Sequence, residues 1–170
     1  MRERTIVLSG FSKAFAMTGW RLGYICAPKA IIDVVYKIHQ FGIMCAPTAA
    51  QYVALAALNT SFENGFKEVK EMRAQYDERR KYLVGRLNAM GLSCFEPRGA
   101  FYAFPCVKST GLNGEEFAYK LLEAKNVAVV PGNAFGDSGE DFIRISYAYS
   151  IDKIKAALDK IEEFITELKK

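Results

Sequence analysis

The chain has 170 residues, of which 51% are hydrophobic and 25% charged, a composition typical of a globular protein with one or two domains. The net charge of +4 arises from basic residues interleaved with acidic ones, which favours solvated helix faces over a nucleic-acid surface. No apolar run approaches the length of a membrane span, so we expect neither nucleic acid nor a membrane as a partner.

The first part of the chain predicts two strands followed by two helices. Residues 5–8 are apolar and predict a buried strand, and residues 21–27 predict a second strand. A helix is expected over residues 30–41. Another helix is expected to begin after Pro47, where Thr48 is placed to cap it.

The middle of the chain predicts one long helix. Apolar residues recur at near-helical spacing through residues 63–90, and Gly91 ends the run. The members of this stripe are Val69, Met72, Tyr76, Leu83, Leu87 and Met90. A long helix with one apolar stripe suits a connector between domains, because the repeat is too short and irregular for a coiled coil.

The last part has the pattern of a small α/β domain. Short strands are expected at residues 92–95, 101–105, 127–130 and 142–148.

Two helices complete this domain. Asn113 and Glu116 have the spacing of a capping box, and Ser150 is placed to cap a final amphipathic helix. The apolar stripe of that final helix is expected to face the core: Ile151, Ile154, Leu158, Ile161, Ile165 and Leu168.

A lysine and an arginine stand close together near the start of the chain. Lys13 follows the first predicted strand, and Arg21 follows a Thr-Gly turn. A lysine amine in water is almost fully protonated at neutral pH, but burial or a nearby cation frees its lone pair to attack a carbonyl. A guanidinium fork matches a phosphate, and Ser12 adds a hydroxyl donor. These groups predict a site for pyridoxal phosphate, which carries both an aldehyde and a phosphate. A lone lysine, in contrast, more often belongs to a solvated surface.

Arg144 lies among apolar residues of a predicted strand. A guanidinium is costly to bury without an anion, so Arg144 is expected to have a partner. A structural salt bridge and a substrate carboxylate meet this need equally well.

The cysteines and the single histidine carry no metal motif. The four cysteines are scattered without a CxxC pair, which favours a reduced, cytoplasmic protein over a disulfide scaffold. His39 has no partners for a zinc site or a catalytic triad, so a packing or surface role is expected. The first residues lack the apolar region of a signal peptide.

Residues 12–24, Ser-Lys-Ala-Phe-Ala-Met-Thr-Gly-Trp-Arg-Leu-Gly-Tyr, resemble the lysine motif of class I aminotransferases of the pyridoxal-phosphate fold type I, in the aspartate and aromatic aminotransferase-like subgroup. Four later stretches resemble this family in the same order, so the resemblance covers nearly the whole chain. They are residues 45–51, 99–105, 127–136 and 143–148.

The resemblance implies a role for each candidate site residue. Lys13 is implied to be the Schiff-base residue and proton shuttle, with Arg21 and Ser12 binding the cofactor phosphate. Arg144 matches the family's arginine for the substrate α-carboxylate. Many relatives carry a phosphate-binding serine three residues before the lysine, where this chain has Gly10. No metal is implied.

The resemblance also places Phe101 and Tyr102 near the substrate mouth, although core packing explains these two residues equally well.

The resemblance implies the domain organisation as well. Residues 1–62 are expected to be the end of the large cofactor-binding domain, 63–90 a connector helix and 91–170 the small domain. More than half of each relative precedes the lysine strand, so we expect a C-terminal fragment that is inactive in isolation. The parent is expected to be a cytoplasmic homodimer that exchanges an amino group between an amino acid and a 2-oxo acid.

Two alternatives share this fold. One is a pyridoxal-phosphate-dependent lyase, which uses the same lysine chemistry but sends the proton elsewhere. The other is a non-catalytic, aminotransferase-like sensing module.

Overall fold

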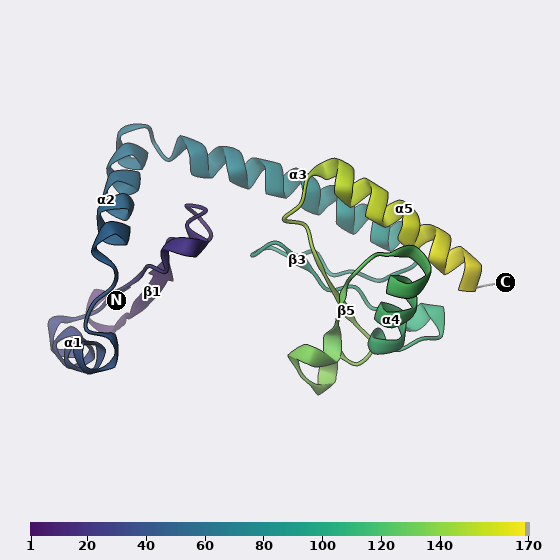
Figure 1. Ribbon diagram of the computed structural model, residues 1–170, viewed down its shortest axis with the longest axis horizontal. Coiled ribbons are helices and arrows are strands. Elements are labelled where there is room, and N and C mark those ends of the chain that lie inside the picture. Colours follow the sequence, from purple (N-terminus) through teal and green to yellow (C-terminus); the bar gives the residue numbers. More distant parts are fainter. Residues whose placement is uncertain (169–170) are drawn as a thin grey trace. The chain divides into compact units, whose positions relative to one another are not determined.

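The computed structural model describes residues 1–168, whose contacts divide into two compact units (Figure 1). Unit 1 comprises Met1–Met72, and unit 2 begins at Arg73. Helix α3 (Lys67–Ala89) starts in unit 1 and continues through unit 2. Among the described residues, no helix combines the length and apolar character needed to span a membrane.

Unit 1 consists of a β-hairpin and helices. Its two strands are antiparallel, with Gly10 opposite Gly23 at the end nearest the connecting loop. The elements in chain order are η1 (Arg2–Arg4), β1 (Val7–Gly10), η2 (Thr18–Trp20), β2 (Gly23–Cys26), α1 (Lys29–Ile43) and α2 (Thr48–Glu63).

The expectation that the first strand is buried is wrong. The side chain of Leu8 in β1 is 70% exposed, and Ile6 and Val7 are exposed as well. Among residues 1–168 only β2 pairs with this strand, so its apolar side chains keep much of their accessible surface.

Thr48 does not cap α2, contrary to expectation. Pro47 holds the N-cap position with φ −54° and ψ 127°, and Thr48 is already the first helical residue. The ring of Pro47 fixes φ, and its side chain offers no oxygen to the helix. The side-chain amide of Gln51 instead donates a hydrogen bond to the carbonyl oxygen of Ala46 (2.9 Å) at this end of the helix.

A small core joins α2 to the loop between the strands of unit 1. Phe11 and Met17 from the loop and Ala54 from α2 are buried together. Their partly buried neighbours are Phe15, Leu22, Val53, Ala57 and Leu58. The loop is therefore anchored through its apolar side chains.

Unit 2 is an antiparallel three-stranded sheet with helices on one face. The strand order is β3-β5-β4, with Tyr102 opposite Ser146 and Val130 opposite Arg144. Besides α3, its elements are β3 (Tyr102–Ala103), η3 (Lys108–Thr110), α4 (Gly114–Lys125), β4 (Val130–Pro131), η4 (Gly132–Phe135), η5 (Asp137–Gly139), β5 (Ile143–Ser146) and α5 (Ile151–Leu168).

The strands are shorter than predicted, and the expected strand at residues 92–95 does not form. Leu92 and Cys94 are buried, which explains the strand-like alternation in the sequence. The backbone N–H of Cys94 donates to the side-chain oxygen of Asn88 (2.9 Å). Because a side chain accepts this hydrogen bond, no neighbouring strand is needed there.

The core of unit 2 confirms the helical stripes read from the sequence. Leu83 and Leu87 of α3, Leu121 of α4, and Leu158 and Ile161 of α5 are all almost fully buried. Figure 1 shows α5 running alongside α3 within this unit. The predicted stripe residue Leu168 is exposed, whereas Phe164, absent from the prediction, is buried.

The predicted helix caps of unit 2 are present. The Asn113 side chain accepts from the N–H of Glu116 (2.9 Å), and the Glu116 carboxylate accepts from the N–H of Asn113 (3.1 Å), which completes a capping box for α4. The Ser150 hydroxyl lies 3.5 Å from the N–H of Lys153, a long hydrogen bond at the start of α5.

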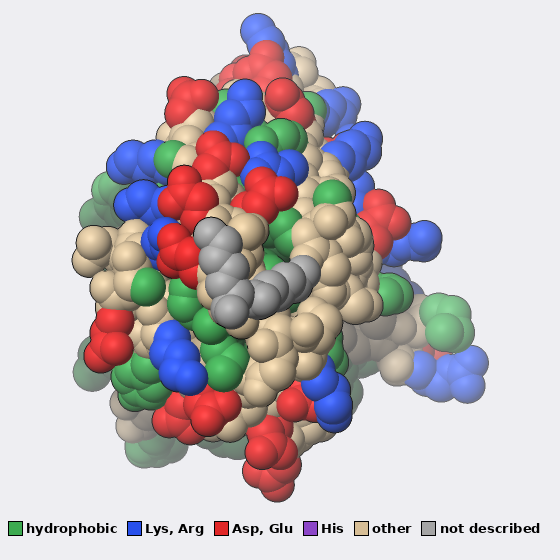
Figure 2. All heavy atoms as spheres, turned by 90° about the vertical axis from the view of Figure 1, so that its right-hand side faces the viewer, with side chains coloured by type: hydrophobic (Ala, Val, Ile, Leu, Met, Phe, Trp, Pro, Cys, Tyr) green, Lys and Arg blue, Asp and Glu red, His purple; other side chains and the backbone are tan. Residues whose placement is uncertain are grey.

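Charged side chains on the surface of unit 2 pair across helices. Arg86 of α3 binds Asp159 and Glu162 of α5, each at 2.9 Å, and Lys125 binds Glu167 of α5 at 2.7 Å. Figure 2 shows acidic and basic side chains interspersed on the face it presents. This agrees with the solvated helix faces expected from the charge pattern.

The cysteines are free thiols in different surroundings. Cys26 and Cys45 in unit 1 are exposed, whereas Cys94 in unit 2 is buried, and this burial raises the pKa of its thiol. His39 is exposed on α1, in line with a surface role. Within residues 1–168, no group of three or more histidine, cysteine or acidic side chains is arranged to hold a metal ion.

Candidate functional site

Lys13 and Ser12 lie in the loop of residues 11–22, which the β1–β2 pairing closes. The backbone N–H of Phe11 donates to Leu22 at the loop base (3.2 Å), and that of Ala16 donates to Lys13 (3.2 Å). The Lys13 side chain is exposed and that of Ser12 is half-buried. Phe11 and Met17 are turned into the small core and anchor the loop on either side of these two residues.

The base of this loop requires close backbone contact. A Cβ added to Gly23 would lie 3.0 Å from the carbonyl oxygen of Ser9, and one added to Gly10 would lie 3.3 Å from that of Leu22. Glycine at both positions therefore lets the strands approach where the loop begins.

Arg21 lies at the other end of the same loop, in the left-handed region with φ +51°. Its Nη1 donates to the carbonyl oxygen of Thr18 (3.0 Å), which anchors the guanidinium at one corner. Within residues 1–168 this is the one hydrogen bond of the Arg21 side chain, so its remaining N–H groups are available to an anion. One short loop thus carries an amine, a hydroxyl and a guanidinium.

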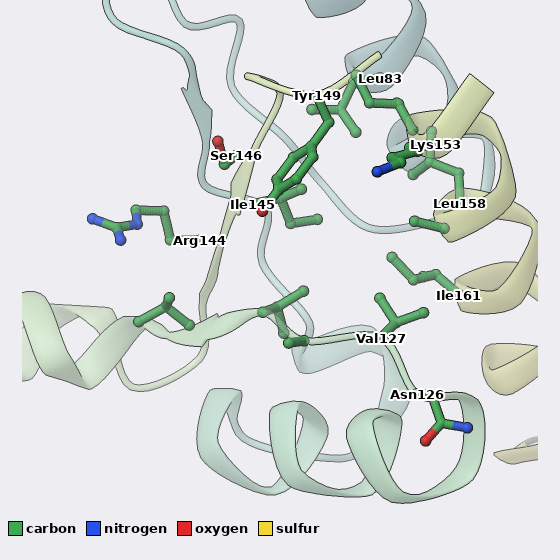
Figure 3. Close-up of a pocket in the computed structure, with 15 residues that line it drawn as sticks. Leu83, Asn126, Val127, Arg144, Ile145, Ser146, Tyr149, Lys153, Leu158 and Ile161 are labelled. Atoms are coloured by element: carbon green, nitrogen blue, oxygen red, sulfur yellow. The ribbon is translucent and has the colours of Figure 1, made fainter. Parts of the chain in front are cut away.

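Arg144 lies in β5 on the sheet face that is turned away from the helices. Ile143 is buried and Ile145 packs against the core, so alternation along the strand places Arg144 on the opposite face. A cavity of about 440 Å³ lies beside this strand, and Arg144 lines it together with Ile145, Tyr149 and Lys153 among others. Figure 3 shows the guanidinium of Arg144 pointing away from these three residues.

Two aromatic rings hold the guanidinium of Arg144. Its central carbon lies 4.4 Å from the centre of the Tyr102 ring and 4.3 Å from the centre of the Phe135 ring. Both distances are within the range of a cation–π contact. Among the described residues no carboxylate pairs with Arg144 and no group hydrogen-bonds to its side chain. The structure gives it aromatic neighbours in place of a salt bridge.

The ring of Phe135 belongs to a larger aromatic group. Phe104 meets Phe135 edge-on (centroids 6.1 Å apart) and stacks on Phe142 (5.2 Å apart). A Cβ on Gly132 would overlap the carbonyl oxygens of Gly139 and Phe142, so the segment that carries Phe135 is seated tightly against its neighbours.

Phe101 and Tyr102, for which two roles were open, differ in their surroundings. Phe101 packs against the core of unit 2 and stacks on Tyr76 with centroids 5.9 Å apart. Tyr102 instead contacts Arg144. The contact of Phe135 with Arg144 was not predicted, because these residues lie on different elements; the only sequence signal was the position of Phe135 within the family-like stretch 127–136.

The candidate residues therefore form two clusters. Ser12, Lys13 and Arg21 belong to unit 1, and Arg144 with its aromatic neighbours belongs to unit 2.

Comparison with known proteins identifies the family. Residues 1–161 match the family model described as aminotransferase class I and II. The aspartate aminotransferase of Pyrococcus abyssi is 49% identical over 169 residues, which cover 99% of this chain and 43% of that protein. The aromatic-amino-acid aminotransferase 2 of Thermococcus litoralis is 44% identical over 169 residues, covering 99% of this chain and 43% of that protein.

Solved structures show the same relationship. The crystal structure of an aromatic aminotransferase from Pyrococcus horikoshii OT3 superimposes with a TM-score of 0.91 at 47% identity, over 99% of this chain and 44% of that chain. The chain thus spans less than half the length of these relatives and has the fold of the corresponding part of a fold type I enzyme. From its motifs, its fold and these matches, the chain belongs to the class I and II aminotransferase family.

Proposed function

We propose that the protein to which this chain belongs is a pyridoxal-phosphate-dependent aminotransferase that exchanges an amino group between an amino acid and a 2-oxo acid. The observation that carries this proposal is the loop of residues 11–22, in which Ser12, Lys13 and Arg21 stand together. Its donor set suits a ligand with both an aldehyde and a phosphate. When bound, pyridoxal phosphate supplies an electron sink for the bond to the substrate Cα.

Lys13 has two tasks in this proposal. Its amine would hold the cofactor through the aldehyde, since it is the one primary amine of the loop. When not engaged with the cofactor, the same amine would be placed to move a proton at the substrate Cα.

Arg21 and Ser12 are proposed to bind the phosphate. The hydrogen bond from Arg21 to Thr18 fixes one corner of the guanidinium and leaves its other donors for phosphate oxygens. An arginine suits this position because, unlike a lysine, it does not compete for the aldehyde.

Arg144 is proposed to bind the α-carboxylate of the substrate. It is cationic, half-buried and unpaired with any carboxylate in residues 1–168, so its in-plane N–H groups suit a bidentate contact. An aminotransferase needs such a contact because both its substrates carry a carboxylate beside the reacting carbon.

The parent is further proposed to act as a homodimer in the cytoplasm. Exposed apolar side chains on α1, such as Phe41 at 95% and Ile38 at 68%, support an interface, because large apolar patches mark contact surfaces. The free thiols Cys26 and Cys45 support a reducing compartment.

The first test traps the cofactor on the chain. Pyridoxal phosphate is added to the purified protein, borohydride reduces the adduct, and peptide mass mapping locates the modified lysine. We expect a near-stoichiometric adduct at Lys13, with a Lys13→Ala variant unlabelled. An Arg21→Ala variant should need about tenfold more pyridoxal phosphate for half-labelling, because a charge-assisted phosphate contact is lost.

A matched control uses Lys29, which is exposed but held by Asp33 at 2.7 Å. Lys29→Ala should leave the labelling of Lys13 unchanged. Labelling scattered over surface lysines, with no preference for Lys13, would contradict the proposal for this loop. In a longer polypeptide that contains the chain, amino transfer dependent on a 2-oxo acid separates a transferase from a lyase.

A further inference from the structure

We propose that Tyr102 and Phe135 are positioning residues that clamp the guanidinium of Arg144 and set the plane in which it binds a carboxylate. This inference rests on the proposed carboxylate-binding role of Arg144. It gives a positioning role to two aromatic side chains that accept no hydrogen bond from the N–H groups of Arg144.

The geometry of the clamp determines which donors remain open. The guanidinium carbon lies at nearly equal distances, 4.4 and 4.3 Å, from the two ring centres. A planar cation approached by two ring systems loses rotational freedom, while the N–H bonds at its edge stay free. A carboxylate binds an arginine through that edge, with two parallel N–H···O bonds.

The chemistry of the neighbours also matters. A structural carboxylate beside Arg144 would stabilise the charge but would occupy the same donors that a substrate needs. Aromatic rings stabilise the cation through their quadrupole and accept no conventional hydrogen bond from it. The clamp therefore offsets the cost of half-burying a charge and keeps the binding edge open.

Each ring is itself held in place. Tyr102 lies in β3 opposite Ser146, and its ring contacts that of Phe101 with centroids 4.7 Å apart. Phe135 is supported by Phe104. Its segment is held by a hydrogen bond from the N–H of Gly132 to the carbonyl oxygen of Phe142 (2.8 Å), the residue just before β5. The two rings come from different elements, β3 and η4, so the packing of both elements determines where the guanidinium of Arg144 is held.

The test begins with the position of the guanidinium. We would label the chain with ¹⁵N-arginine and record the side-chain Nε–H spectrum, assigning the Arg144 signal by its loss in Arg144→Lys. Aromatic rings stacked on the guanidinium should shift this signal upfield. Tyr102→Leu and Phe135→Leu should each reduce the shift, whereas Tyr102→Phe and Phe135→Tyr should retain it.

The second measurement is the affinity for a carboxylate, using pyruvate as the probe in the same spectra. We expect each leucine variant to bind pyruvate about threefold to tenfold more weakly, and each aromatic variant to stay within about twofold of the wild type. If the two rings served only the stability of unit 2, any aromatic ring would again suffice at either position. In that case, however, the pyruvate affinity of the variants would not change in parallel with the Arg144 signal.

The outcomes separate the clamp from the proposed function. Leucine variants that keep both the Arg144 shift and the pyruvate affinity would overturn the clamp. A loss of the shift without a change in affinity would overturn its positioning role. A wild-type chain with the shifted signal but no pyruvate binding would support the clamp and instead overturn the carboxylate role of Arg144. Phe135 is 52% exposed, so its variants keep the test decisive if a Tyr102 variant does not fold.

Discussion

At the scale of single residues, Arg80 joins two carboxylates on the surface of unit 2. It donates to Asp77 (2.7 Å) and to Glu96, and its side chain is only 15% exposed. Hydrogen bonds from Lys81 and then Arg80 lower the pKa of Asp77, and the hydrogen bond from Arg80 lowers the pKa of Glu96. Both carboxyl groups therefore favour the folded state when they are ionised.

These shifts predict an acid-sensitive stability. The unfolded state binds more protons than the folded state once the pH falls below about 5, so the free energy of unfolding should fall as the pH decreases through the lowered pKa values. Arg80→Met should flatten this dependence, as measured by urea unfolding between pH 7 and pH 3.

The neighbouring Arg79 provides the matched control for this prediction. It contacts the Tyr76 ring and Gln75 but pairs with no carboxylate among the described residues. Arg79→Met should keep the wild-type pH dependence; an equal flattening in both variants would count against the assignment to Asp77 and Glu96.

Residue-scale prediction from the sequence worked where the signal was local. The sequence places Lys13 in the loop after the first strand, as the structure has it. Arg21, expected to begin the second strand, lies in the same loop because β2 starts only at Gly23. The contact between Arg144 and Phe135 could not be derived, since it depends on how β5 and η4 pack together in unit 2.

At the scale of elements, the capping box of α4 is a separable contribution to stability. Asn113→Ala removes the acceptor for the N–H of Glu116 and should lower the free energy of unfolding by about 1 kcal/mol. Chemical denaturation measures this loss. Glu123→Ala changes an exposed residue of the same helix and should keep the free energy of unfolding within about 0.5 kcal/mol of the wild type. An equal loss of stability in both variants would contradict a stabilising role of the cap.

Two consecutive leucines of α4 give a stricter test of the core. Leu121 is fully buried, whereas Leu122 is 45% exposed. Leu121→Ala should cost about 2–5 kcal/mol because it leaves a cavity among α4, α5 and the sheet, and Leu122→Ala should cost less than about 1 kcal/mol. If urea denaturation gave the same loss in the free energy of unfolding for both variants, the difference in burial between Leu121 and Leu122 would be contradicted.

Element-scale prediction succeeded for helices and was weaker for strands. The stripe of α5 identified its buried face because each helical turn repeats the signal. The alternation around Leu92 and Cys94 suggested a strand, but the side chain of Asn88 takes the hydrogen bond that strand pairing would have used. The division of the chain at residues 62 and 90 into family domains stays a prediction.

At the scale of the whole molecule, the two units differ in how much apolar surface they bury. Helix α1 has no buried residue, and the buried cluster of unit 1 contains only Phe11, Met17 and Ala54. Helix α5 alone buries five side chains: Ile154, Leu158, Ile161, Phe164 and Ile165. Local opening follows buried apolar contact, so the units should differ in local stability.

Hydrogen exchange measures this difference directly. In the 170-residue chain, amides of α1 should exchange several-fold faster than those of α5 under native conditions, because fewer contacts must break to expose them. Equal protection of the two helices would contradict the proposed difference.

Because the cysteines differ in exposure, their rates of alkylation report on the opening of unit 2. Cys26 and Cys45 are exposed, so an alkylating reagent should modify them at once, while buried Cys94 reacts only when unit 2 opens. The rate of the slow phase of alkylation, followed by mass spectrometry without any added probe, therefore measures how often unit 2 opens, independently of unit 1.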